Sequence, residues 1–332
     1  MPLTGENRLL VSLGLRRMRT EPNPGLRALF EIAGVSHREA EAYHLGFTIG
    51  PRINAGGRIA HALDGVRLFT TRNADAIRSL AQRLDRLNSE RQQLTQTMLA
   101  EADQQLKDVS SDLLFVHADG WSEGVVGLVA GKISDRYYRP ALAASVSGTT
   151  VKGSARSIPG FDITAAIERA AHILMRYGGH AQAAGFTLHR DNLEEFKSIL
   201  LQSATEALTD ELRERLLKVD AQISLADVTS DLVTQLARLE PFGMANPKPV
   251  FQLSGLRLTD CRTIGRDRDH LKCRVSDGTH ELELLGFGKG DLFQDVSACD
   301  SIDVVGSLAE NTWQGRTALQ LHIKDIRNAQ AS

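Results

Sequence analysis

Cysteine is scarce in this 332-residue chain, which contains only Cys261, Cys273 and Cys299. Three irregularly spaced thiols cannot make a disulfide framework, so the sequence fits a reducing compartment. No stretch approaches the roughly 20 apolar residues that are needed to span a bilayer. The first residues lack both the basic start and the apolar core of a signal peptide. Together these absences predict a cytoplasmic protein that has no membrane partner.

A large excess of charge of one sign is also missing, because the formal net charge is −2. Global charge therefore gives no indication of nucleic-acid binding, although a binding groove needs only local positive charge. Residues 1–60 do hold eight arginines against five glutamates. This local excess fits either an ordinary solvated helical surface or a phosphate-binding region.

Length and composition favour two or three globular domains, because 42% of the residues are hydrophobic and 24% are charged. Residues 1–73 are expected to be helical, with a capping box at Ser36 and Glu39 that starts a helix through Ala42. From residue 74 to about 107, apolar residues recur at spacings of three, four and seven. This pattern predicts one long connecting helix within 74–110 rather than a coiled-coil dimer, for which the stripe is too short and irregular.

The second half of the chain changes character twice. In residues 111–210, short apolar runs at 113–117 and 141–146 alternate with helical segments at 125–138, 163–177 and 192–208, which predicts an α/β domain. In residues 218–330, five short strands are separated by turn signals. They are expected over 251–259, 270–277, 280–287, 301–309 and 317–326, and their number and spacing favour a small β-barrel of the OB-fold type. The predicted fold class is therefore multidomain α/β plus β.

Two motifs place arginines where they could bind phosphate. The glycine-rich segment Gly50–Arg58 contains Arg52, Asn54 and Arg58, and guanidinium groups contact phosphate oxygens in pairs. The alternative is a helix–loop–helix turn whose arginines cap helices or face water. In the segment Lys152–Ser157, a strand aims Ser154 and Arg156 to the same side, which suits either a phosphate clamp or a polar hairpin edge.

The most unusual stretch is Gly178-Gly-His-Ala-Gln-Ala-Ala-Gly185. Two glycines after a predicted helix favour a tight turn with positive φ values and exposed backbone N–H groups. His180 would then lie at the mouth of that turn, where it could donate to a phosphate or an exposed base. The alternative is a histidine that is capped and satisfied in the core.

In this order, the three motifs resemble those of the RecJ family of single-strand exonucleases, within the DHH phosphoesterase superfamily. The segment Trp121–Gly127 resembles the family's helix-opening segment, and Gly178–His180 resembles the Gly-Gly-His signature of the DHH-associated domain. The resemblance covers essentially the whole chain. It implies a helical remnant of a DHH domain, a DHH-associated α/β domain and an OB-fold. It also implies metal-dependent 5′-to-3′ hydrolysis of single-stranded DNA in repair and recombination.

The resemblance also implies site residues and partners. The residues implied to bind phosphate and to frame the same pocket are Arg52, Asn54, Arg58, Ser154, Arg156, Gly178, Gly179 and His180. The residues of the barrel implied to track the strand are Arg262, Arg266, Arg268, Lys272 and Trp313, of which Trp313 fits core packing equally well. The implied partners are single-stranded DNA and, further, a single-strand-binding protein or a helicase.

The metal ligands of this family do not occur in the sequence. The family binds a divalent ion, Mn²⁺ or Mg²⁺, through aspartates and histidines that include an Asp-His-His triplet, and this chain has no such triplet. The nearest groups, at 117–119 and 267–270, are isolated and are expected to be turn and surface residues. A zinc site is disfavoured because no cysteine pair has the required spacing. We therefore expect no catalytic or metal-binding residue in this chain.

Three hypotheses follow. The first is the substrate-binding half of a RecJ-type exonuclease that is inactive alone. The second is a non-catalytic module that binds single strands and complements a separate catalytic domain. The third is another oligonucleotide phosphodiesterase of the DHH family, against which the barrel counts, because very short substrates need no extended binding groove.

Overall fold

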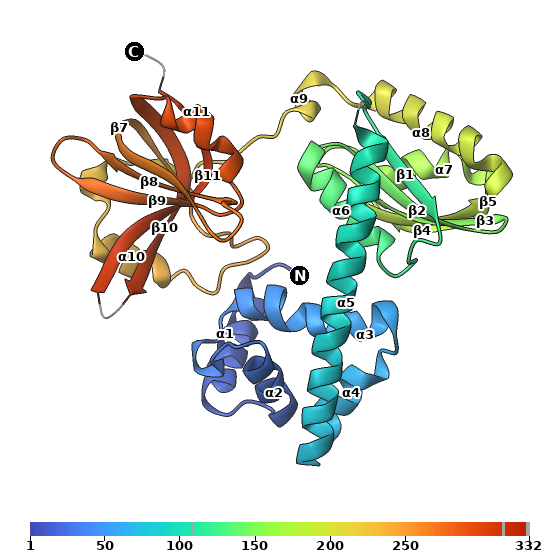
Figure 1. Ribbon diagram of the computed structural model, residues 1–332, viewed down its shortest axis with the longest axis horizontal. Coiled ribbons are helices and arrows are strands. Elements are labelled where there is room, and N and C mark those ends of the chain that lie inside the picture. The colour runs from blue at the N-terminus through green and yellow to red at the C-terminus, as the bar shows by residue number, and fades with distance from the viewer. Residues whose placement is uncertain (108, 314–315, 330–332) are drawn as a thin grey trace. The chain divides into compact units, whose positions relative to one another are not determined.

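The computed structural model describes residues 1–107, 109–313 and 316–329, without the side chains of residues 312–316 (Figure 1). The chain forms two compact units, one from Arg16–Leu216 and the other from Met1–Leu15 together with Leu217–Ser332. Within the described ranges, none of the helices combines the length and the apolarity needed to cross a membrane.

The first part of the chain is helical. Its elements are α1 (Gly5–Thr20), α2 (Pro24–Ile32), the short turn η1 (His37–Glu39), the π-helix η2 (His44–Ile49), α3 (Gly50–Ile59) and α4 (Leu63–Thr70). Leu29, Phe30 and Leu68 are fully buried and form a core with Leu84 of the following helix. Burying one such side chain stabilises the fold by about 1.5–3 kcal/mol. This core fixes α3 and α4 against the long helix.

One expectation for this part is wrong, and one segment takes a form that its composition left open. The glycine-rich segment is the helix α3, because Pro51 suits the first turn and Gly56 permits close packing. A Cβ atom at Gly56 would lie 3.3 Å from Cδ2 of Leu84 and 3.1 Å from the carbonyl oxygen of His61. At Ser36, the expected capping box produces only the three-residue turn η1, and the serine side chain makes no capping hydrogen bond.

The predicted connecting helix is present as α5 (Ala74–Leu106), an uninterrupted helix of 33 residues. It is about 50 Å long at 1.5 Å per residue. Asn73 caps its start by accepting a hydrogen bond from the backbone N–H of Ala76. One stripe of α5 packs on the helical core through Ile77 and Leu84, and a later stripe packs on the α/β domain through Met98.

The α/β domain contains a five-stranded sheet with the strand order β1-β2-β3-β5-β4. Its strands are β1 (Leu114–Asp119), β2 (Ala141–Ser147), β3 (Thr150–Arg156), β4 (Leu174–His180) and β5 (Ala183–His189). Strands β1 and β2 are parallel, and the other pairs are antiparallel. The helix α6 (Val126–Tyr137) contacts β2 and β3, next to α5. Beyond this domain the unit ends in a short helix, α9 (Asp210–Arg213).

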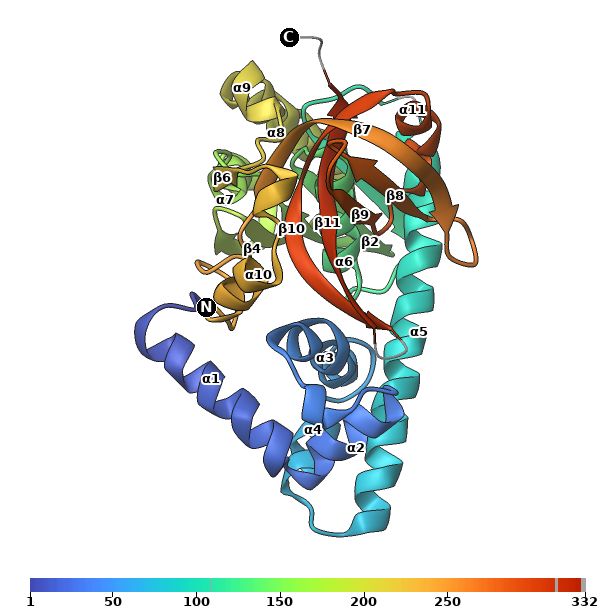
Figure 2. The same cartoon turned by 90° about the vertical axis from the view of Figure 1, so that its left-hand side faces the viewer.

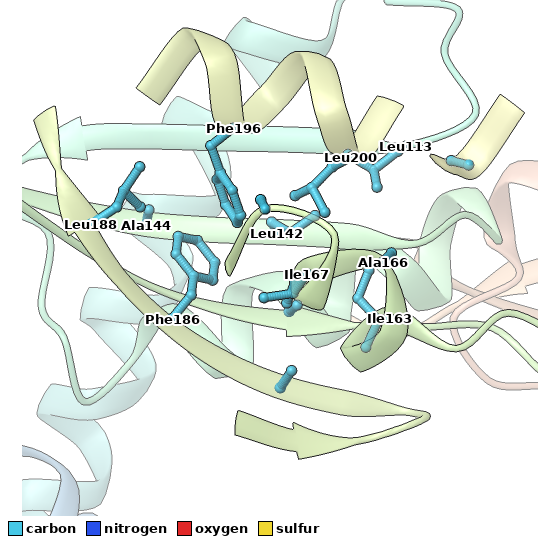
Figure 3. Close-up of a cluster of buried hydrophobic side chains, with 14 of the residues drawn as sticks. Leu113, Leu142, Ala144, Ile163, Ala166, Ile167, Phe186, Leu188, Phe196 and Leu200 are labelled. Atoms are coloured by element: carbon cyan, nitrogen blue, oxygen red, sulfur yellow. The ribbon is translucent and has the colours of Figure 1, made fainter. Parts of the chain in front are cut away.

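The other core of the domain lies under α7 (Ile163–Glu168) and α8 (Leu193–Ala207). Figure 3 shows Phe196 and Leu200 of α8 pointing toward the sheet, where Phe186 of β5 meets them. The rings of Phe186 and Phe196 lie 4.8 Å apart, which is the range of favourable aromatic pairs. This core holds β3 and β5 in place behind the surface that carries the predicted polar site.

The helix expected over 163–177 is wrong in its second half. Helix α7 ends at Glu168, and after the turn η3 (Ala171–Ile173) the chain forms the edge strand β4. The tight turn expected at the glycine pair is therefore also wrong, and neither Gly178 nor Gly179 has a positive φ. Gly179 pairs with Ala184 of β5, where a Cβ atom would lie 2.4 Å from a backbone oxygen. The second glycine is thus needed for close strand pairing.

The predicted β-barrel is confirmed in the other unit (Figure 2). Its strands are β7 (Phe251–Ile264), β8 (His270–Ser276), β9 (Glu281–Gly286), β10 (Ser301–Trp313) and β11 (Arg316–Asn328), and the two-residue strand β6 (Ala221–Gln222) extends β7. The order β7-β8-β9-β11-β10 closes through pairing of β10 with β7, which is the connectivity of an OB-fold. The short helix α10 (Ser230–Ala237) lies between β6 and β7, and the short helix α11 (Phe293–Ser297) lies between β9 and β10.

Candidate nucleic-acid interface

A cleft of about 770 Å³ lies in the unit that contains the α/β domain. It is bordered by the end of α3, the first turn of α6 and the strands β3, β4 and β5. Its charged and hydroxyl side chains are those of Arg58, Glu123, Lys152, Ser154, Arg156, Arg176, Tyr177 and Thr187. Four cations and one carboxylate give the cleft a local positive charge that the neutral composition of the chain hides.

The strand β3 supplies the centre of the cleft. Ser154 and Arg156 lie on the same side of the strand, and Nη1 of Arg156 donates to Oγ of Ser154 over 2.9 Å. The same nitrogen donates to the carbonyl oxygen of Ala155 over 2.7 Å, which holds the guanidinium group in place. Gly127 of α6 leaves room for both groups, because a Cβ atom there would lie 3.0 Å from Oγ of Ser154.

The end of α3 touches the segment just before α6. Nη1 of Arg58 donates to the carbonyl oxygen of Gly124 over 3.2 Å. A Cβ atom at Gly124 would overlap the backbone oxygen of Arg58, so only glycine permits this approach. The contact brings Arg58 beside the N-terminal turn of α6, where backbone N–H groups favour anions.

Sequence reasoning missed Arg91 on α5. Its Nη2 donates to Oδ1 of Asn88 over 2.9 Å, while its buried Nε has no hydrogen-bond partner among the described residues. Burial and, second, the positive charge of Arg58 lower the pKa of Arg91. A sequence signal existed, because Asn88 is buried four residues after Leu84, on the stripe where an apolar residue is expected.

The same electrostatic effect acts on β3. Burial first, and the charge of Arg58 second, lower the pKa of Arg156. Within the described part of the chain, none of the three guanidinium groups of Arg58, Arg91 and Arg156 forms a salt bridge. The carboxylate of Glu123 pairs instead with Lys152, whose Nζ lies 3.0 Å from Oε2. The charge of Arg58 thus lowers the pKa of both Arg91 and Arg156, and among the described residues none of the three guanidinium groups is paired with a carboxylate.

Four of the eight residues predicted to bind phosphate or frame the pocket do not border this cleft. Arg52 donates to Asp85 of α5 over 2.9 Å and to the carbonyl oxygen of Thr48, so it fastens α3 to α5. Asn54 is exposed on α3. Gly179 and His180 continue β4 beyond the cleft, and the histidine side chain is exposed. Of the predicted set, the structure gathers Arg58, Ser154, Arg156 and Gly178.

The predicted barrel residues differ in their environments. Arg266 and Arg268 are exposed in the loop between β7 and β8. Lys272 is neutralised by Glu283, with 2.7 Å between Nζ and Oε2, and Arg262 lies 3.4 Å from Asp260. The side chain of Trp313 is outside the described residues, so its predicted role is not addressed.

The described residues do not gather into a site that fits a catalytic metal. Across residues 1–107, 109–313 and 316–329, no group of three or more His, Cys, Asp or Glu side chains could hold an ion. Nε2 of His117 instead lies 3.2 Å from Nζ of Lys197. Burial is the larger cause, and the charge of Lys197 the second, of a lowered pKa of the His117 ring. Cys261 and Cys273 are cross-strand neighbours, with 2.8 Å between their sulfur atoms.

Two matches to domain families define the class of the chain. Residues 110–206 match the DHHA1 domain, and residues 219–325 match the RecJ OB domain. The α/β domain with its arginine-lined cleft and the closed barrel are therefore a DHHA1 domain and an OB domain.

Comparison with individual relatives identifies the family. The single-stranded-DNA-specific exonuclease RecJ of Bacillus subtilis is 36% identical over 329 residues, which are 98% of this chain and 42% of that protein. The crystal structure of RecJ from Thermus thermophilus in complex with Mg²⁺ has a TM-score of 0.87 at 31% identity and covers 100% of this chain and 50% of that one. A second structure of the same protein contains Mn²⁺. The chain is homologous to the RecJ single-stranded-DNA-specific exonucleases and belongs to their family. It spans about half the length of these relatives.

Proposed function

We propose that this chain is the substrate-binding half of a RecJ-type 5′-to-3′ exonuclease, and that its cleft binds the terminal 5′-phosphate of single-stranded DNA. The observation that carries the proposal is that Arg58 and Arg156 border the cleft, that the charge of Arg58 also acts on Arg91 of α5, and that none of this cluster of three has a carboxylate partner among the described residues. Repulsion within the cluster is relieved when a phosphate binds. Each charge-assisted hydrogen bond to such a group contributes about 1.5–3 kcal/mol.

The chemistry of the cleft favours a phosphate over other anions. Guanidinium groups from α3 and β3 bind phosphate oxygens in pairs, and Oγ of Ser154 adds a neutral donor beside Arg156. The first turn of α6 adds the positive end of a helix dipole. A terminal phosphate has more free oxygens and more charge than an internal one, so this set of donors distinguishes a 5′-phosphorylated end.

A short ligand tests the cleft without the barrel. A 5′-phosphorylated trinucleotide should raise the melting temperature of the chain by an amount that grows with its concentration. The same trinucleotide with a 5′-hydroxyl should raise it much less. Equal shifts from both ligands would mean that the cleft does not recognise the terminal phosphate.

We further propose that the chain does not hydrolyse DNA by itself, because its described residues offer no metal site. A rigorously purified sample with Mn²⁺ or Mg²⁺ should leave single-stranded DNA intact. Manganese-dependent degradation that follows the chain through every purification step would overturn this proposal. The predicted association with a single-strand-binding protein or a helicase remains a prediction.

Because the part of the chain that the structure describes has no cluster of metal ligands, a second candidate is a binding module that complements a separate catalytic domain. Adding a separately produced metal-binding domain of a RecJ protein should then restore cleavage. The Arg156→Ala variant is the matched control, and its mixture with the same domain should restore less cleavage than the wild-type chain does. If neither the wild-type chain nor the variant restores cleavage, this second candidate is wrong.

A further inference from the structure

Two cysteines meet across the first hairpin of the barrel. Cys261 of β7 pairs directly with Cys273 of β8 in the antiparallel register, and 2.8 Å separate their sulfur atoms. Residues that face each other in antiparallel strands have Cα atoms about 4.5 or 5.5 Å apart, and disulfide bonds join Cα atoms that are about 4.4–6.8 Å apart. The two thiols can therefore form a bond while the strands stay paired.

The two thiols differ in their access to solvent. Cys273 is buried in the core of the barrel, whereas Cys261 is only partly buried at the margin of that core. The hydrogen bond between the thiols lowers the pKa of Cys261 and raises the pKa of Cys273, and burial raises the pKa of Cys273 further. A reagent in solution therefore meets Cys261 first, as the thiol that more readily becomes a thiolate, and Cys273 is in position to react second.

The segment between the two cysteines is basic. It contains Arg262, Arg266, Arg268 and Lys272, which are the cations that the sequence predicted to track a strand. Arg266 and Arg268 are exposed in the loop that joins β7 to β8. A bond between the cysteines would close residues 261–273 into a covalent ring and would limit the conformations that this loop can adopt. The oxidation state of the pair thus determines how freely the basic loop moves.

The third cysteine is an internal reference. Cys299 follows α11, and its Sγ donates to the carbonyl oxygen of Asp295 over 3.2 Å. All three thiols belong to the described residues, and only those of Cys261 and Cys273 are paired with each other. A reaction that depends on the cross-strand geometry should therefore leave Cys299 out of any bond within the chain.

We propose that Cys261 and Cys273 are a redox pair, which a low-molecular-weight disulfide such as oxidised glutathione converts into a reversible disulfide bond that clamps the β7–β8 hairpin. The Cys261 thiolate attacks one sulfur atom of the reagent, forms a mixed disulfide and releases one thiolate. Cys273 then attacks the sulfur of Cys261 and releases the second thiolate. The released thiolates take up the protons that the two cysteines lose. Two cysteine thiols are thus oxidised while one small disulfide is reduced to two thiols, and an excess of the small thiol reverses both steps.

This pair is separate from the proposed phosphate site. Neither cysteine borders the arginine-lined cleft. The inference therefore goes beyond the proposed function and does not depend on it. Failure to recognise a 5′-phosphate would leave the redox pair intact, and the absence of a disulfide would leave the cleft intact.

Mass spectrometry and hydrogen exchange of the full chain test the pair. The purified chain is equilibrated with reduced and oxidised glutathione in graded ratios, its free thiols are blocked, and its peptides are analysed without reduction. We expect one cross-linked peptide pair that contains Cys261 and Cys273, lacks two hydrogen atoms and disappears after dithiothreitol. Backbone amides of residues 265–269 should exchange more slowly in the oxidised chain. Two thiols that stay reduced at every ratio, or equal exchange in both forms, would overturn the inference.

Substitution of single cysteines tests the order of the two steps. In Cys273→Ser the second thiol is missing, so Cys261 should keep a glutathione adduct that the wild-type chain loses. In Cys261→Ser, Cys273 should stay unmodified because it is buried. Cys299→Ser is the matched control and should form the same cross-link as the wild-type chain. A main cross-link that includes Cys299 would contradict the assignment, and the wild-type chain gives that result even if a variant fails to fold.

Discussion

Nη1 of Arg156 lies 2.9 Å from Oγ of Ser154, two residues earlier on the same strand. The hydroxyl group thus orients the guanidinium group before any ligand arrives. Replacement of Ser154 by alanine should weaken binding of a 5′-phosphorylated strand about threefold to tenfold, which corresponds to one neutral hydrogen bond. Ser147→Ala, at the exposed end of β2, is the matched control and should bind as the wild type does. A loss as large as that of Arg156→Ala would instead make the serine a principal ligand.

Substitution of Arg91 should change the stability of the chain and its affinity for single strands in opposite directions. Arg91→Gln removes a buried like charge next to Arg58, so the melting temperature of the free chain should stay the same or rise. The same change should weaken single-strand binding and reduce its dependence on salt by about one phosphate contact. Arg86→Gln, exposed on the same helix, makes the same change in charge and should alter neither quantity. A lower melting temperature without any change in the salt slope would contradict this account.

Alanine substitutions at Gly178 and Gly179 should distinguish an effect on strand pairing from an effect on DNA binding. A Cβ atom at Gly178 would meet nothing within 4 Å, whereas at Gly179 it would lie 2.4 Å from the backbone oxygen of Ala183. Gly179→Ala should therefore lower the melting temperature by several degrees through disrupted pairing of β4 with β5. Gly178→Ala should leave the melting temperature unchanged but weaken phosphate-dependent binding, because Gly178 borders the cleft. Destabilisation by Gly178→Ala alone would contradict the prediction.

Chelation should have no effect on strand binding. The described residues contain no cluster that could hold a metal ion, and the proposed anion site consists of arginines, a hydroxyl group and a helix terminus. Affinity for single-stranded DNA and the melting temperature should be the same in excess EDTA and in Mn²⁺. A large loss of either quantity in EDTA would reveal a metal site that these residues do not explain.

Much of the fold was predictable because its elements have strong local patterns. The stripe that includes Ile77 and Leu84 predicted α5, and the strands of the barrel follow from short apolar runs between turn residues. The capping box at Ser36 did not form a helix, and the other departures involve glycines. Gly56 is helical because α3 packs closely on α5, and Gly179 is in a strand because β4 approaches β5 closely. Both requirements come from tertiary packing, which local propensity does not contain.

The site was predictable only in part for a similar reason. Ser154 and Arg156 are neighbours on one strand, so alternation alone put them on the same side. Arg58 and Arg91 come from two helices. Arg52 lies in the same glycine-rich segment as Arg58 but pairs with Asp85. Which arginine reaches the cleft depends on the rotation of α3, and that is fixed by packing against α5.

The most direct test is equilibrium binding of one single-stranded oligonucleotide in 5′-phosphorylated, 5′-hydroxyl and duplex forms to the wild-type chain and to Arg156→Ala. We predict tight, salt-sensitive binding of the phosphorylated single strand, about tenfold or more weaker binding of the hydroxyl form, and loss of that difference in Arg156→Ala. Equal binding of the two single strands by the wild-type chain, or an unchanged difference in Arg156→Ala, would contradict the assignment of the cleft to the 5′-phosphate.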